Sequence, residues 1–200
     1  MFFSTLVSFL LLTVPALFTP GPNNLMLLTS SAKFGPRATV PHGAGVVSGF
    51  CLMTFLLGLG VAEVMTAFPA LKWILKYAAV AYFVYMAYKL LGVRFDSKAG
   101  SGEARPMRYY EAVLFQWINP KAWVIGISFV VAFVQPGENR LWSLLAIIAG
   151  LAVVSTGSTI TWMIFGERLR AFLHATGLEH YLGMILAGLM GIAIVMFLLP

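Results

Sequence analysis

Two short motifs place amide groups and one ammonium group inside apolar stretches of the sequence. The first is Thr-Pro-Gly-Pro-Asn-Asn at residues 19–24, and the second is Gln-Trp-Ile-Asn-Pro-Lys at residues 116–121. Proline lacks a backbone N–H and disfavours helix at the residue before it, so each motif is expected to break a helix. Backbone groups freed in this way cannot face lipid and must be buried or line a wet cavity. Both motifs therefore have the chemistry of a binding site for a small polar solute.

The sequence around these motifs is typical of a membrane protein. No charged residue precedes Lys33, and about 20 apolar residues suffice to cross a hydrocarbon core of ~30 Å. The whole chain is 60% apolar and 10% charged, which excludes an ordinary soluble domain and makes the lipid bilayer a partner. We expect the first segment to be retained rather than cleaved as a signal peptide. No Lys or Arg precedes its apolar run, and no small-x-small cleavage site follows it.

Charge and cysteine content exclude several other classes. The net charge of +6 is spread through loops, without a basic cluster interleaved with aromatic residues, so a nucleic-acid partner is not expected. Cys51 is alone, and the chain has no HExxH motif, so neither a disulfide nor a metal or other cofactor is predicted. An intramembrane hydrolase needs a nucleophile and a base at matched depth. His42 and Ser48 are six residues apart, on different faces of one helix, so we do not expect an enzyme.

Hydropathy predicts an all-α integral membrane protein. The expected apolar segments are about 2–32, 41–62, 70–91, 111–134, 141–165 and 180–199. A polar linker at 93–110 divides this single transmembrane domain into two pseudo-repeats, 1–92 and 111–200. Helices 1 and 4 are expected to be broken at proline.

The two halves share a pattern. Pro120 lies 98 residues after Pro22, and the same shift places Lys121 on Asn23 and the second apolar segment on the fifth. The third segment overlaps the sixth only roughly. Because each half has three spans, the second half must be inverted relative to the first. Corresponding interrupted helices in two such halves are the best indication in a sequence of a transport site.

The distribution of Lys and Arg predicts the orientation. Nine of these residues fall in the loops after the first, third and fifth segments, against three on the other side. Positively charged loops face the cytoplasm, which would place both termini in the periplasm.

Lys121 is the ionisable residue that lies well inside a predicted span, and a buried ammonium group needs a partner. Asn119, the carbonyls freed at Pro120 and a substrate carboxylate are the candidates. A zwitterionic amino acid would suit the two breaks. Helix N-termini and Lys121 could bind its carboxylate, and exposed carbonyls with the amide oxygen of Asn23 or Asn24 could bind its ammonium group. The expected substrate-binding residues are Pro20, Gly21, Pro22, Asn23, Asn24, Gln116, Asn119, Pro120 and Lys121.

Further residues are expected to support this site. Gly45 and Gly49 form a GxxxG pattern, which allows close helix packing; we favour packing within the chain over a dimer face and keep a homodimer as the alternative. Ser155, Ser158 and Thr159 fall on one face of the fifth segment. Hydroxyls in membrane helices commonly bond carbonyls of their own helix, and we favour this interpretation over a pore-lining role, which stays the alternative.

At these residues the chain resembles the LysE/RhtB superfamily of bacterial amino-acid exporters, and within it the RhtB-like branch. The resemblance rests on residues 19–24, on 34–37 leading to 41–45, and on 115–123, in their order and six-span context. It implies an inner-membrane secondary exporter of amino acids or their derivatives, driven by proton antiport. It carries over the Pro20–Asn23 and Asn119–Lys121 residues as the transport core, with Arg37 and Gly45 in the segment after the first motif. Pro36 departs from the bulky apolar residue more usual there.

The sequence therefore predicts an exporter that works by alternating access on an unidentified amino-acid-like solute. Two other classes stay open. In one, the chain is a non-transporting helical subunit whose Lys121 pairs with a partner chain; in the other, it is a passive channel for small solutes.

Overall fold

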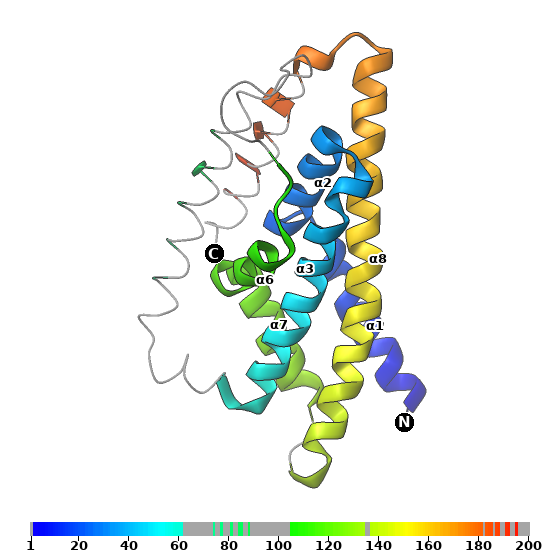
Figure 1. Cartoon of the computed structure of the whole chain (residues 1–200). Helices are drawn as coiled ribbons and strands as arrows, with labels where there is room; N and C mark the ends of the chain where they lie inside the picture. The colour runs from blue at the N-terminus through cyan, green and yellow to red at the C-terminus, as the bar shows by residue number, and fades with distance from the viewer. Residues whose placement is uncertain are drawn as a thin grey trace.

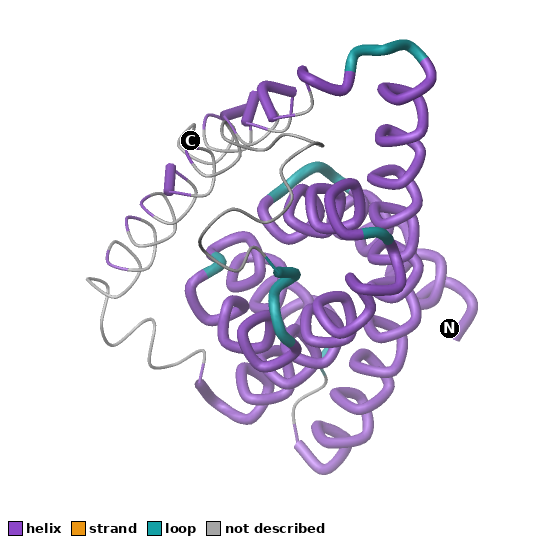
Figure 2. Tube along the Cα trace, turned by 45° about the horizontal axis from the view of Figure 1, so that its top comes forward, coloured by secondary structure: helices purple, strands orange, loops and turns teal. Residues whose placement is uncertain are grey.

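The computed structural model describes residues 2–61, 105–134 and 137–181, with scattered positions between 74 and 88 and between 183 and 195. Throughout these residues the regular structure is helical, as Figure 2 shows, which confirms the all-α class for the described part of the chain. Most of the expected spans 70–91 and 180–199, and most of the linker at 93–110, lie outside the described residues.

Both proline motifs break a helix, as predicted. Helix α1 (Phe2–Phe18) and helix α2 (Pro22–Phe34) meet at an angle of 54°. Helix α6 (Tyr109–Ile118) and helix α7 (Pro120–Phe133) meet at 74°. In each pair the second helix begins with proline, which is favoured there because the first N–H of a helix has no partner within the helix.

Two unbroken helices complete the described bundle. They are α3 (Pro36–Leu56), which continues into a π-helical turn at Leu57–Val61, and α8 (Arg140–Ala175). Short 3-10 turns lie at Gly137–Asn139 and Glu179–Tyr181. Among the described residues, two helices are long and apolar enough to cross a membrane, and four spans result if each bent pair counts as one.

The helices run in opposed directions in the two halves of the chain. In Figure 1, α1 and α2 rise and α3 descends, whereas α7 descends and α8 rises. Elements that the 98-residue shift pairs, α2 with α7 and α3 with α8, are thus antiparallel.

Close packing of α2 on α8 holds the centre of the bundle. Ser31 Oγ donates a hydrogen bond to the Met163 carbonyl at 2.7 Å. A Cβ atom at Gly166 would lie 2.2 Å from the Leu28 carbonyl oxygen, so only glycine permits this approach. Buried apolar side chains such as Leu27 and Phe115 fill the space around this contact.

Two predicted boundaries are wrong. The loop expected around Lys33 and Arg37 shrinks to Gly35, whose φ of 85° ends α2, and α3 begins at Pro36 instead of 41. Helix α8 runs to Ala175, so Arg168 and Arg170 are helical rather than in a loop. Gly166 does not interrupt this helix. It keeps a helical conformation and allows the close approach of α2 described above.

Gly45 and Gly49 bring α3 against α6. A Cβ atom at Gly45 would lie 2.3 Å from the Tyr109 carbonyl oxygen, and one at Gly49 would lie 2.8 Å from Val113 Cα. Ser48 Oγ adds a hydrogen bond of 2.9 Å to the Tyr109 hydroxyl. The expected packing of this pattern within the chain is confirmed.

We predict that Gly45→Ala destabilises the protein by about 1–3 kcal/mol, because the new methyl group forces α6 away from α3. Thermal unfolding in detergent, followed by tryptophan fluorescence, measures the change. Gly157→Ala is the matched control, since its Cβ would meet Phe18 at an ordinary 3.8 Å. Equal melting temperatures for the two variants would contradict the close approach.

Candidate functional site

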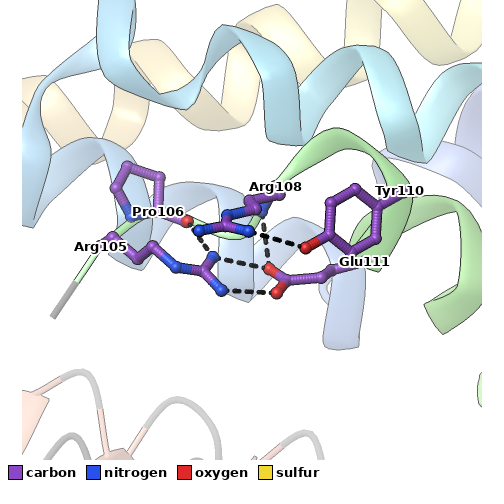
Figure 3. A network of polar contacts seen from close by, with 5 residues as sticks. All are labelled: Arg105, Pro106, Arg108, Tyr110 and Glu111. Atoms are coloured by element: carbon purple, nitrogen blue, oxygen red, sulfur yellow. Dashed lines mark hydrogen bonds and ion pairs between the residues drawn. The ribbon is translucent and has the colours of Figure 1, made fainter. Parts of the chain in front are cut away.

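A polar network stabilises the start of α6, the helix whose last turn begins the second motif at residues 116–121. The Glu111 carboxylate accepts hydrogen bonds from both Arg105 guanidinium nitrogens, at 2.7 and 2.6 Å, and from the Arg108 backbone N–H at 2.8 Å (Figure 3). The side chain of Arg108 bonds the Tyr110 hydroxyl at 2.9 Å. A carboxylate that accepts the N-cap N–H supports the beginning of a helix.

The two broken helices meet through Lys121. Its Nζ atom donates to the Thr19 carbonyl at 2.9 Å and lies 3.5 Å from the Pro20 carbonyl oxygen. Lys121 belongs to the first turn of α7, so its half-buried side chain reaches across to the end of α1. The expected partners of this ammonium group, Asn119 and the carbonyls freed at Pro120, are wrong, because the carbonyls that it binds are those of the other break.

A second bridge runs in the opposite sense. Asn23 Nδ2 donates to Gln116 Oε1 at 2.8 Å, and Gln116 Nε2 donates back to Asn23 Oδ1 at 3.3 Å. Gln116 is fully buried and also bonds the Ala112 carbonyl at 2.9 Å. Asn23 and Lys121, which the 98-residue shift pairs, therefore each contact the opposite break.

The carbonyls left without partners at the end of α1 are bonded by side chains. Leu17 O accepts from Asn24 Nδ2 and from Ser158 Oγ, both at 2.8 Å. Thr19 O accepts from Asn24 Nδ2 at 2.9 Å in addition to Lys121. Asn24 thereby ties the start of α2 to the end of α1 across the bend.

The two helix N-termini at the site differ. Asn119 Oδ1 caps α7 by accepting the Lys121 backbone N–H at 3.2 Å. Gly21 precedes α2 and gives it no side-chain cap. Pro22 has no N–H, and the Leu25 N–H bonds the Gly21 carbonyl at 2.9 Å. The backbone N–H groups of Asn23 and Asn24, with the positive end of the helix dipole, are therefore those available to an anion.

A cavity of about 40 Å³ lies between the breaks, lined by α1, α2, α3, α7 and α8. At ~10–15 Å³ for each water molecule, it holds a few waters. Of the predicted residues, the cavity is lined by Gly21, Pro22, Asn23, Asn24, Asn119, Lys121, Ser155, Ser158 and Thr159. Three more lie beside it: Pro20 and Gln116 through their bonds to Lys121 and Asn23, and Pro120 at the start of α7. Arg37, Gly45 and Gly49 do not line it.

The hydroxyl face of α8 contributes one wall of this cavity. Ser155, Ser158 and Thr159 are buried there, and Ser158 bonds Leu17 of α1 instead of a carbonyl of its own helix. The reading that these hydroxyls bond their own helix is thus wrong for Ser158. Thr156, on the exposed side of the same helix, does bond its own helix, at the Ala152 carbonyl and 2.7 Å.

Sequence reasoning missed two kinds of residue. The carbonyls of Leu17 and Thr19 are central acceptors, and the only signal for them was their position just before Pro20. His42 was expected at the edge of a segment, but it is buried within α3 with 2% of its surface exposed, because that helix begins at Pro36.

A comparison with known families covers both breaks. The model of the LysE type translocators matches residues 14–199, from the last turn of α1 onward. The chain belongs to this family. The resemblance stated from the sequence is thereby confirmed, and the translocator is a membrane protein.

This LysE type translocator is similar to named proteins from several bacteria. Examples come from Escherichia coli strain K12, Shigella sonnei and Shigella flexneri, each described as a cysteine/O-acetylserine efflux protein. Each is 27% identical over 166 residues, which cover 82% of this chain and 84% of the relative. No solved structure matches the chain.

Proposed function

We propose that this translocator exports amino acids or their derivatives across the bacterial inner membrane as a proton-coupled secondary transporter. The observation that carries the proposal is the meeting of two broken helices at a polar cavity, with Lys121 on the Thr19 and Pro20 carbonyls. Broken helices that present free carbonyls and a free N-terminus are how many transporters bind small charged solutes. The efflux activity in the names of the relatives supports the outward direction.

The chemistry of the first break suits a zwitterion. Its carbonyls at Thr19 and Pro20 attract an ammonium group, and the uncapped N-terminus of α2 after Gly21 attracts a carboxylate. The ammonium and carboxylate groups of an α-amino acid lie on neighbouring carbon atoms. The carbonyls and the helix N-terminus likewise lie close together, at one bend of the chain.

Alternating access is proposed from the arrangement of the two halves. The antiparallel course of α2 and α7, and of α3 and α8, supports inverted repeats that rock around a shared site (Figure 1). The excess of Lys and Arg in the odd-numbered loops supports periplasmic termini.

Transport by purified protein in liposomes tests the proposal. Labelled cysteine, O-acetylserine and a panel of other amino acids are loaded inside, and efflux is measured with and without a pH gradient. We expect saturable efflux of at least one of these solutes that accelerates with the gradient. Flux that neither saturates nor responds to the gradient would indicate a channel. No flux of any solute above protein-free liposomes would indicate a non-transporting subunit.

A further inference from the structure

We propose that Lys121 is the group that carries the transported proton, because its ammonium group occupies the carbonyl site that the ammonium group of the substrate takes in the other half of the cycle. This inference rests on the proposed export function and names the residue through which a proton and a substrate exclude each other.

The geometry makes the two occupants exclusive. Lys121 Nζ bonds the Thr19 carbonyl at 2.9 Å and lies 3.5 Å from the Pro20 carbonyl oxygen, so it fills the cation site at the break. Its stem lies across the start of α2, because a Cβ atom at Gly21 would be 3.0 Å from both its Cδ and its Nζ. A substrate therefore reaches neither the carbonyls nor the free helix N-terminus until this side chain moves.

Charge adds to this exclusion. Of the residues that line the cavity from α1, α2, α3, α7 and α8, Lys121 alone is titratable. The neighbouring side chain from α6 is the neutral Gln116, and Glu111 is held by Arg105 at the far end of that helix. His42 of α3 is buried but is not among the lining residues. With no carboxylate in the lining, two ammonium groups at one pair of carbonyls repel each other without compensation.

Loss of the Lys121 proton resolves this conflict. As the ammonium group of a substrate enters from the cytoplasm, one N–H bond at Lys121 Nζ breaks. The electron pair stays on the nitrogen, and the proton passes through cavity water to the cytoplasm. After the substrate leaves to the periplasm, the neutral amine takes a proton from water on that side and returns to the carbonyls. One cycle therefore moves one substrate out and one proton in.

Calorimetry of the purified protein in detergent tests this exchange. L-cysteine under reducing conditions, O-acetylserine and any other amino acid transported in the liposome screen serve as probes, titrated in buffers with different heats of ionisation. We expect about one proton released for each substrate bound. Lys121→Met should bind without proton release, and Lys121→Arg should bind at least about tenfold more weakly, because guanidinium does not lose its proton at these pH values. Lys33→Met, which removes a cation outside the cavity lining, should release protons as the wild type does.

The outcomes separate this inference from the function on which it rests. Binding by the wild type without proton release, or equal release by the wild type and Lys121→Met, would overturn Lys121 as carrier and leave export standing. If Lys121→Met does not fold, the wild-type release and the Lys121→Arg affinity still decide. The absence of both binding and flux for every probe would overturn the export function itself.

Discussion

Lys121→Met is expected to lower net efflux from liposomes at least about a hundredfold. To return without substrate, the transporter must close its site while the Thr19 and Pro20 carbonyls are bonded, and in this structure Lys121 bonds them. Methionine removes the charged donor from these carbonyls and leaves the Thr19 carbonyl with its bond from Asn24. A hydrogen bond from a charged group contributes ~1.5–3 kcal/mol, and a hundredfold change corresponds to ~2.7 kcal/mol. Efflux of labelled substrate into substrate-free buffer measures the loss.

Exchange of labelled for unlabelled substrate should survive in the same variant. Exchange never requires the empty site to close, so it separates the return step from substrate binding. Membrane insertion and folding should also be intact, since Lys121 contacts backbone at the break rather than the apolar core. Lys33→Met serves as the control, because Lys33 lies over the Phe34 ring at 5.3 Å and does not line the cavity. Normal net efflux from Lys121→Met would contradict a role for this residue in transport.

Asn24→Leu is expected to destabilise the protein by about 2–4 kcal/mol and to lower transport with it. The Asn24 amide bonds the Leu17 and Thr19 carbonyls at 2.8 and 2.9 Å and is 8% exposed, so leucine removes two partly buried hydrogen bonds from the bend. Thermal unfolding in detergent and liposome efflux report the two effects.

A change at an exposed hydroxyl provides the control for Asn24. Thr156→Val removes the bond to the Ala152 carbonyl on the exposed face of α8 and should change stability by less than about 0.5 kcal/mol. If Asn24→Leu melts at the temperature of Thr156→Val, the Asn24 amide does not hold the bend together.

The breaks were predictable because their cause is local. Pro22 and Pro120 act on their own backbone, and each lies in a motif where the sequence predicts a break and the structure begins a new helix. The contacts of Lys121 were not predictable in the same way. Its carbonyl partners at Thr19 and Pro20 lie about 100 residues away in sequence, so the contact depends on how two bends of 54° and 74° face each other.

Glycine explains the errors in helix length. Gly35, with a φ of 85°, ends a helix, whereas Gly166 stays helical and admits the backbone of α2 at Leu28. A glycine in a sequence can indicate either a backbone with positive φ or a close contact with another helix, and the residue type alone does not say which. The same ambiguity applies to Ser158, whose face on α8 was predicted but whose acceptor on α1 required the packed structure.

The length of α8 has a consequence for work on whole cells. Its 36 residues extend ~54 Å, so the helix is roughly 20 Å longer than a hydrocarbon layer of ~30 Å is thick. Glu167, Arg168 and Arg170 are exposed in its last turns, so the extra length lies at the C-terminal end of the helix. A reporter attached at Arg168 would lie beyond the apolar segment 141–165 and would reveal which side of the membrane this end of α8 faces.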